Sequence, residues 1–79
     1  PQVLKNVKVS SFGKLRLNED EDIRIAINEA QRELGSEGRV LVRASGTEPL
    51  VRVMLEGKDT EQIERLSEQI AEVVKERLI

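Results

Sequence analysis

The sequence predicts a small α+β domain of order β-α-β-β-α, with two helices on one face of a small sheet that contains antiparallel strands. Apolar residues recur at helical spacing in two segments, which is typical of amphipathic helices. Valine-rich segments precede and separate them, as in strands. A length of 79 residues allows one domain, over residues 1–79. Because only 1% of the residues are aromatic, the core must consist of Val, Ile, Leu and Ala.

The first part of the chain is predicted to form a strand followed by a helix. Residues Val3–Val9 are rich in valine and alternate loosely, which favours an opening strand. The polar cluster Ser10–Gly13 predicts a turn, and Lys14–Leu17 a short extension or loop. A helix is predicted over Glu21–Leu34, because acidic residues precede it, Gly35 follows it, and these residues recur at helical spacing: Ile23, Ala26, Ile27, Ala30 and Leu34.

The second part is predicted to form two strands and a closing helix. The strands Arg39–Ala44 and Leu50–Glu56 stand on either side of a loop over residues 45–49. Asp59 or Thr60 then caps the second helix, whose apolar stripe is Ile63, Leu66, Ile70, Val73, Val74 and Leu78.

The strand period of two sorts the side chains of the predicted hairpin onto two faces. Leu41 and Arg43 share the second face with Arg52 and Met54, and Arg43 and Arg52 lie opposite or diagonal to one another. Like charges so placed repel, so the arrangement needs a functional reason. Phe12 and Met54 are predicted as packing residues. The first face is wholly apolar and is predicted to carry both helices: Val40, Val42, Ala44, Val51, Val53 and Leu55.

Composition excludes several classes of function. Without Cys there are no disulfides or thiolate chemistry, and without His or Cys there is no nucleophile–base pair for an independent enzyme. A net charge of −2 and the lack of a basic stripe disfavour nucleic acid and anionic membranes. The acidic run 19–22 is assigned to the helix N-terminus rather than to a metal. No apolar run is long enough to span a bilayer and no signal sequence is recognised, so a cytoplasmic protein is expected.

The loop between the central strands has a composition that folding alone does not explain. It combines guanidinium forks, hydroxyls and turn amides, which are the donors that bind a phosphate monoester. Gly46 offers dihedrals closed to other residues, whereas Glu48 and Pro49 shape and stiffen the loop. The motif is not a Walker loop, because a strand follows it and no Gly-Lys-Ser/Thr is present. The predicted phosphate contacts are Arg43, Ser45, Gly46, Thr47 and Arg52.

Two alternatives remain open at this point. In the first, the loop is a polar hairpin turn whose arginines pair with Glu48 or Glu56. In the second, the chain is a small β-α-β-β-α binding module, for nucleic acid or regulation, without an enzymatic role. Lys14 and Arg16 assist an anion site only if their segment folds toward Ser45.

A long contiguous segment resembles a known family. Residues 38–57, GRVLVRASGTEPLVRVMLEG, closely resemble the phosphate-binding segment of the α-D-phosphohexomutases, in which RASGTEP leads into a strand bearing RVM. The opening PQVLKNV is also similar to the start of the fourth, C-terminal domain of these enzymes. The resemblance therefore covers essentially the whole chain, and it implies a fold like one half of the TATA-binding protein.

The resemblance implies that the chain is a fragment of a four-domain isomerase. Such an enzyme interconverts glucosamine 6-phosphate and glucosamine 1-phosphate through a 1,6-bisphosphate, in the synthesis of amino-sugar nucleotides and cell-wall precursors. The phosphoserine, the Mg²⁺ and the sugar-reading residues lie in the other three domains, so this fragment alone is expected to be inactive and to hold no metal. Its expected partners are the phosphate group of the hexosamine substrate and those three domains. Matched by position, the phosphate contacts are again Arg43, Ser45, Gly46, Thr47 and Arg52.

Overall fold

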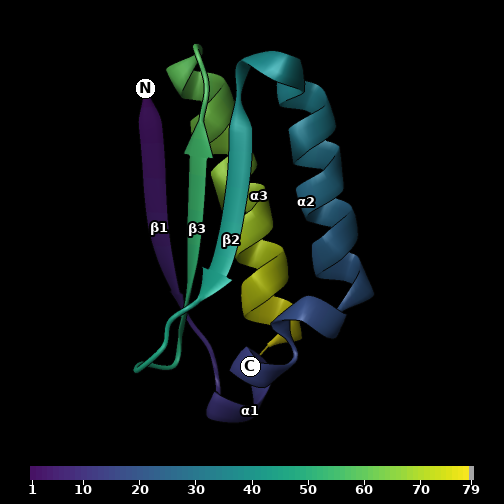
Figure 1. Cartoon of the computed structure of the whole chain (residues 1–79), viewed down its shortest axis with the longest axis vertical. Helices are drawn as coiled ribbons and strands as arrows, with labels where there is room; N and C mark the ends of the chain where they lie inside the picture. Colours follow the sequence, from purple (N-terminus) through teal and green to yellow (C-terminus); the bar gives the residue numbers. More distant parts are fainter. Residues whose placement is uncertain (79) are drawn as a thin grey trace.

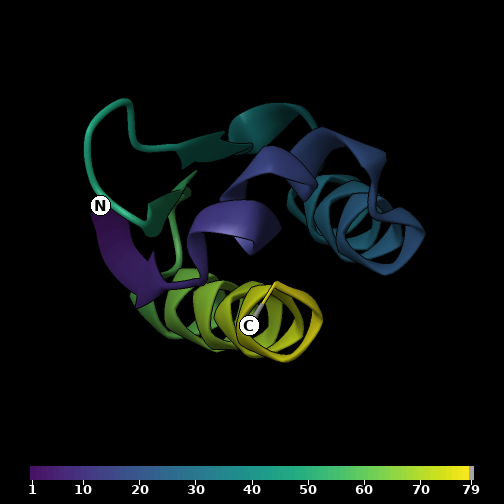
Figure 2. The same ribbon diagram turned by 90° about the horizontal axis from the view of Figure 1, so that it is seen from below.

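The computed structural model describes residues 1–78 and consists of one antiparallel sheet with two long helices on one face (Figure 1). The strand order is β1-β3-β2, so the last strand in sequence is the central one. Figure 2 shows the same layers from the end of the molecule at which the short helix α1 lies. The elements are β1 (Gln2–Lys8), α1 (Ser11–Leu15), a 3-10 turn (Leu17–Glu19), α2 (Glu21–Leu34), a 3-10 turn (Gly35–Glu37), β2 (Arg39–Ala44), β3 (Leu50–Glu56) and α3 (Thr60–Arg77).

The long helices begin and end where capping residues dictate. Asp20 caps α2 by accepting a hydrogen bond from the Ile23 amide at 3.1 Å. Gly35 ends α2 with a φ of 66°, a left-handed value that favours glycine. Asp59 caps α3 by accepting from the Glu61 and Gln62 amides. The helix predicted over Glu21–Leu34 and the two central strands are therefore confirmed with the same bounds.

The segment after β1 differs from the prediction of a turn and a loop. Residues Ser11–Leu15 form an α-helix, in which the Ser10 hydroxyl accepts from the Gly13 amide at 2.8 Å. This helix packs on the end of α3: a Cβ on Gly13 would lie 2.0 Å from the carbonyl oxygen of Leu78. A single turn of helix is unstable by itself, so the tertiary contact, which sequence patterns do not record, decides its conformation.

The pairing of β2 with β3 places the apolar side chains as predicted. Val40 lies opposite Leu55, and Val42 opposite Val53, on the face that carries α2 and α3. Ala44 lies at the end of this row and is exposed. The buried core consists of aliphatic residues from the sheet, α2, α3 and the chain end: Val7, Leu17, Ile23, Ala30, Leu34, Val51, Val53, Leu55, Ile63, Leu66, Ile70, Val74 and Leu78.

The prediction that Phe12 is a packing residue is wrong, whereas Met54 is partly buried by its neighbours on the sheet. Phe12 is 82% exposed, because the single turn of α1 turns Gly13, rather than Phe12, toward the rest of the molecule. Met54 lies half-buried on the face of the sheet that no helix covers. Within residues 1–78, no helix combines the length and the apolarity needed to cross a membrane.

Candidate anion-binding site

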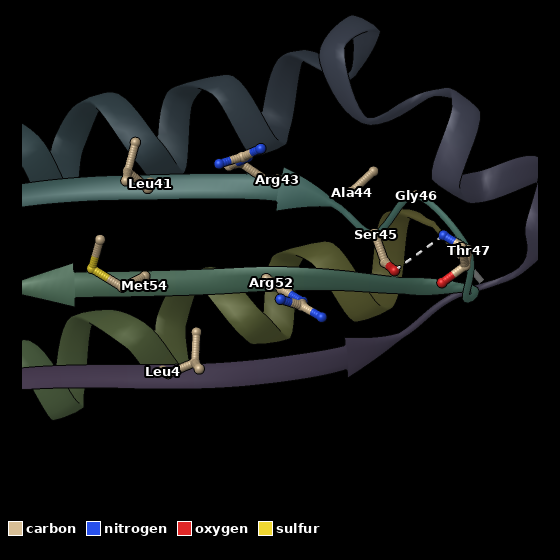
Figure 3. Close-up of a pocket in the computed structure, with 9 residues that line it drawn as sticks. All are labelled: Leu4, Leu41, Arg43, Ala44, Ser45, Gly46, Thr47, Arg52 and Met54. Atoms are coloured by element: carbon tan, nitrogen blue, oxygen red, sulfur yellow. Dashed lines mark hydrogen bonds between the residues drawn. The ribbon is translucent and has the colours of Figure 1, made fainter.

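The candidate site is a pocket of about 430 Å³ on the open face of the sheet, where β2 turns into β3 (Figure 3). One end of the pocket is formed by the loop residues 44–47 and by Arg43 and Arg52. The other end is formed by the apolar side chains of Leu4, Leu41 and Met54. The pocket therefore has a polar, positively charged end at the loop and an apolar end along the strands.

Arg43 and Arg52 are directly opposite one another in the β2–β3 register, which confirms the predicted pairing. Both side chains are exposed on the open face. In Figure 3 the two guanidinium groups lie over neighbouring strands and turn away from each other, as like charges do. On the other side of Arg52, the residue opposite it in β1 is the uncharged Asn6.

Neither arginine forms an ion pair with a carboxylate in residues 1–78. Glu56, one of the two partners considered from the sequence, instead binds Arg39, with 2.6 Å between its Oε1 and the arginine Nε. Two uncompensated positive charges thus stand side by side at the pocket. The polar-turn alternative required these arginines to be neutralised, and this geometry does not support it.

The loop directs backbone amides toward a single hydroxyl. The Ser45 Oγ accepts from the Thr47 amide at 3.4 Å and from the Glu48 amide at 3.3 Å. Since both contacts use the oxygen lone pairs, the hydroxyl hydrogen of Ser45 is free to donate outward. The Ser45 amide donates to the Leu50 carbonyl at 2.9 Å and closes the hairpin. The amides of Ser45, Thr47 and Glu48 are thus already bonded within the loop, and the Ser45 hydroxyl is left to donate toward the pocket.

Gly46 does not occupy the special conformation that the sequence suggested. Within residues 1–78, Gly35 is the sole residue with a positive φ, so Gly46 adopts a backbone open to any residue. A Cβ at Gly46 would meet nothing within 4 Å. Gly46 lines the pocket and contributes backbone without side-chain bulk.

Glu48 and Pro49 act in the loop through their carbonyl groups. The Glu48 oxygen accepts from the Leu50 amide at 2.8 Å and from the Lys14 Nζ at 3.2 Å. The Pro49 oxygen accepts from the Val9 amide at 3.0 Å. The segment after β1 therefore does fold against the loop, which sequence reasoning had stated only as a condition.

Leu4 could not be found from the sequence, and the contribution of Lys14 could be stated only as a condition. Leu4 lines the pocket because β1 pairs with β3, and this pairing joins segments about fifty residues apart. Lys14 reaches the loop because α1 docks on the end of α3. Neither contact has a local sequence signal. Arg16, the other residue considered, donates instead to the Arg77 carbonyl at 3.3 Å.

Three ionisable groups that join α2 to α3 have shifted pKa values. Burial alone would raise the pKa of Asp20, but the Ile23 amide and the Arg77 guanidinium outweigh burial and hold this pKa below 3.8. Asp20 in turn raises the pKa of Arg77, and a hydrogen bond from Arg65 lowers the pKa of Glu33. The pocket itself offers guanidinium and hydroxyl donors, which bind anions rather than transfer protons.

No group of three or more acidic, His or Cys side chains within residues 1–78 is arranged to hold a metal ion. The acidic run before α2 instead supplies the Asp20 cap, and Asp20 and Asp22 lie 3.0 and 3.6 Å from the Nε of Arg77. The described residues therefore do not fit a magnesium site.

Comparison with known proteins identifies what the chain is similar to. Residues 4–73 match the model of the phosphoglucomutase/phosphomannomutase C-terminal domain. Phosphoglucosamine mutases of Brevibacillus brevis and a Thermoanaerobacter species are 52% and 50% identical over 100% and 99% of the chain, which spans 17% of each relative. The N-acetylphosphoglucosamine mutase of Aspergillus fumigatus, solved with GlcNAc-6P and magnesium, superimposes with a TM-score of 0.77 at 25% identity, over 100% of this chain and 16% of that one. The alternative of a non-enzymatic binding module has no support in these comparisons.

Proposed function

Since the chain belongs to the phosphoglucomutase/phosphomannomutase family and matches its C-terminal domain, we propose that it is the substrate-phosphate-binding domain of a phosphoglucosamine mutase. The parent enzyme then interconverts glucosamine 6-phosphate and glucosamine 1-phosphate through a 1,6-bisphosphate. This fragment alone is inactive, because the phosphoserine that exchanges the phosphoryl group lies in another domain.

The proposal rests above all on the unneutralised pair of Arg43 and Arg52 beside the hydroxyl-bearing loop residues Ser45 and Thr47, which line the same pocket. When both guanidinium groups turn from their divergent orientation toward a phosphate dianion at the pocket, the dianion accepts charge-assisted hydrogen bonds from them and offsets their repulsion. The hydroxyls of Ser45 and Thr47 and the backbone of Gly46 complete its surroundings. Glu48 and Pro49 hold the loop in shape through their carbonyl contacts.

The role of such a site in the reaction is positioning. Phosphoryl transfer depends on orientation and electrostatic stabilisation more than on covalent help from the protein. Holding the phosphate that does not react directs the opposite end of the sugar toward the phosphoserine. A site that binds phosphate and makes few contacts with the sugar accepts the bisphosphate in either orientation, which a reversible mutase requires.

The remaining parts of the parent protein complete the proposal. The Mg²⁺ that stabilises charge on the transferred phosphoryl group binds outside this chain, and so do the residues that select the sugar. We place the enzyme in the cytoplasm, because charged sugar phosphates do not cross membranes and are used where they are made.

A titration of the chain with glucosamine 6-phosphate, followed by two-dimensional NMR, tests this proposal. We expect chemical-shift changes at the amides of Ser45, Gly46 and Thr47 and at the Nε–H groups of Arg43 and Arg52. Glucosamine, which lacks the phosphate, is the matched ligand control and should leave these signals in place.

Oligonucleotide binding is the competing outcome. If a short single-stranded oligonucleotide shifts the open-face signals and glucosamine 6-phosphate does not, the chain is a binding module of another class and the assignment is wrong.

A further inference from the structure

Lys14 reaches the candidate phosphate loop from outside it. Its Nζ donates a hydrogen bond to the carbonyl oxygen of Glu48 at 3.2 Å, across 34 positions of sequence. The side chain makes no ion pair with a carboxylate in residues 1–78. Within residues 1–78, the one hydrogen bond of the Lys14 side chain is therefore made to the backbone of the loop.

The peptide that Lys14 binds has one hydrogen-bonding group, and Lys14 provides its one hydrogen bond from outside the loop and β3 within residues 1–78. The Glu48–Pro49 peptide lacks an N–H because its nitrogen belongs to Pro49, so the Glu48 carbonyl is its sole hydrogen-bonding group. The oxygen also accepts from the Leu50 amide at 2.8 Å, which is a contact within the loop itself. Lys14 thus supplies the bond that ties this peptide to another part of the molecule.

The position of Lys14 is itself fixed by the end of α3. The Ser10 amide donates to the Leu78 carbonyl at 3.0 Å, and the Ser10 hydroxyl accepts from the Gly13 amide at 2.8 Å. Gly13 approaches the backbone of Leu78 so closely that a Cβ would not fit. The ammonium is accordingly carried on a helix that is anchored on the core.

We propose that Lys14 is a positioning residue, which holds the loop over residues 45–49 in the conformation that binds phosphate. The inference rests on the proposed function of that loop. Together with the bond from the Val9 amide to Pro49, Lys14 fixes the return limb of the loop before any ligand arrives. A loop that is already ordered loses less conformational entropy on binding, and the affinity is higher for that reason.

The test compares Lys14→Met with Lys14→Arg in the 79-residue chain. We expect Lys14→Met to weaken glucosamine 6-phosphate binding roughly fivefold, because the ligand must then order the loop and the entropy lost in doing so lowers the affinity. The backbone order parameters of Gly46, Thr47 and Glu48 in the free protein should fall from about 0.85 toward 0.6. Lys14→Arg should keep both the affinity and the order parameters of the unaltered chain, since a guanidinium also donates hydrogen bonds.

The control is Lys58→Met. It removes an exposed lysine whose Nζ lies 3.0 Å from the Oε2 of Glu37 and which does not contact the loop. It should change neither the affinity nor the order parameters. Weaker binding by Lys14→Met with unchanged order parameters would mean that the ammonium contacts the phosphate directly, and it would overturn the positioning role. Unchanged binding, or a Lys14→Arg variant as weak as Lys14→Met, would overturn it as well.

The proposed function can fail separately. If neither the unaltered chain nor Arg43→Ala binds the sugar phosphate, the proposed phosphate-binding function is wrong. The order parameters of Lys14→Met still show whether Lys14 orders the loop.

Discussion

At the scale of single residues, Arg43 and Arg52 show what the proposed binding site costs in stability. They face each other across β2 and β3 without a carboxylate partner in residues 1–78. Like charges in directly opposed positions destabilise a sheet by a few tenths of a kcal/mol, up to about 1 kcal/mol. The chain keeps this pair on its open face, where Arg39 by contrast is neutralised by Glu56.

Replacing Arg43 with Gln should separate stability from binding. Removal of the charge should leave the free energy of unfolding as it is in the unaltered chain or raise it by up to about 0.5 kcal/mol. The affinity for glucosamine 6-phosphate should fall about tenfold or more, since a hydrogen bond to a charged group contributes about 1.5–3 kcal/mol. Urea unfolding and calorimetric titration measure the two quantities.

Arg32 offers a matched control for this substitution. It is exposed on α2, away from the pocket, and makes no ion pair within residues 1–78. Arg32→Gln should leave the affinity unchanged. An equal loss of affinity in both variants would mean that the ligand senses net charge rather than the pair of arginines.

At the scale of elements, the start of α2 and the end of α3 are joined by one carboxylate. The Asp20 side chain, which is 7% exposed, accepts from the Ile23 amide and from Arg77, whose Nε lies 3.0 Å from its Oδ2. One residue therefore both caps α2 and binds α3. Its lowered pKa means that the charged form is stabilised by folding.

This linkage predicts an acid-sensitive contribution to stability. Because the pKa of Asp20 in the folded chain lies below its ordinary value of 3.8, the contribution is present above about pH 4 and is lost as the pH falls through the folded value. Asp20→Asn keeps the cap and loses the charge, so it should be less stable than the unaltered chain at pH 7 and nearly equal to it at pH 2. Urea unfolding at the two pH values measures this difference.

Asp20→Ala tests the cap itself. It should cost about 1 kcal/mol more than Asp20→Asn at pH 7, because the Ile23 amide also loses its acceptor. Equal stability of the two variants would contradict the capping role.

At the scale of the whole molecule, the end of α3 joins the core to the segment that supports the loop. Leu78 is fully buried, and its carbonyl accepts from the Ser10 amide. Leu78 therefore belongs to the core and also anchors the segment that supports the loop, although it lies outside the pocket.

Leu78→Ala should destabilise the chain strongly. Truncation of a buried leucine costs about 2–5 kcal/mol, which is a large fraction of the stability of a domain of this size. The exposed Leu15, on the same short helix as Lys14, is the matched control, and Leu15→Ala should change the free energy of unfolding by less than about 0.5 kcal/mol. Thermal unfolding of both variants measures the effect, and a similar loss in both would show that Leu78 does not anchor the core.

The sequence by itself determined the long helices, the central hairpin and the residues of the loop. Helix α2 carries its caps and its apolar stripe within one continuous segment. The register that sets Arg43 against Arg52 follows from a short hairpin, in which alternation on one strand fixes the other. These features are local, so they can be read along the chain. The expected likeness to the TATA-binding protein remains a prediction.

Only the tertiary structure decided what supports the loop. A single turn of α1 has too few hydrogen bonds to form without its contact on Leu78, so its residues resembled a turn. The exposure of Phe12 and the bond from Lys14 to Glu48 both follow from that docking. The ordinary conformation of Gly46 likewise became visible only when the whole hairpin was in place. Contacts between residues far apart in sequence depend on how the layers pack, and no local pattern of side chains encodes them.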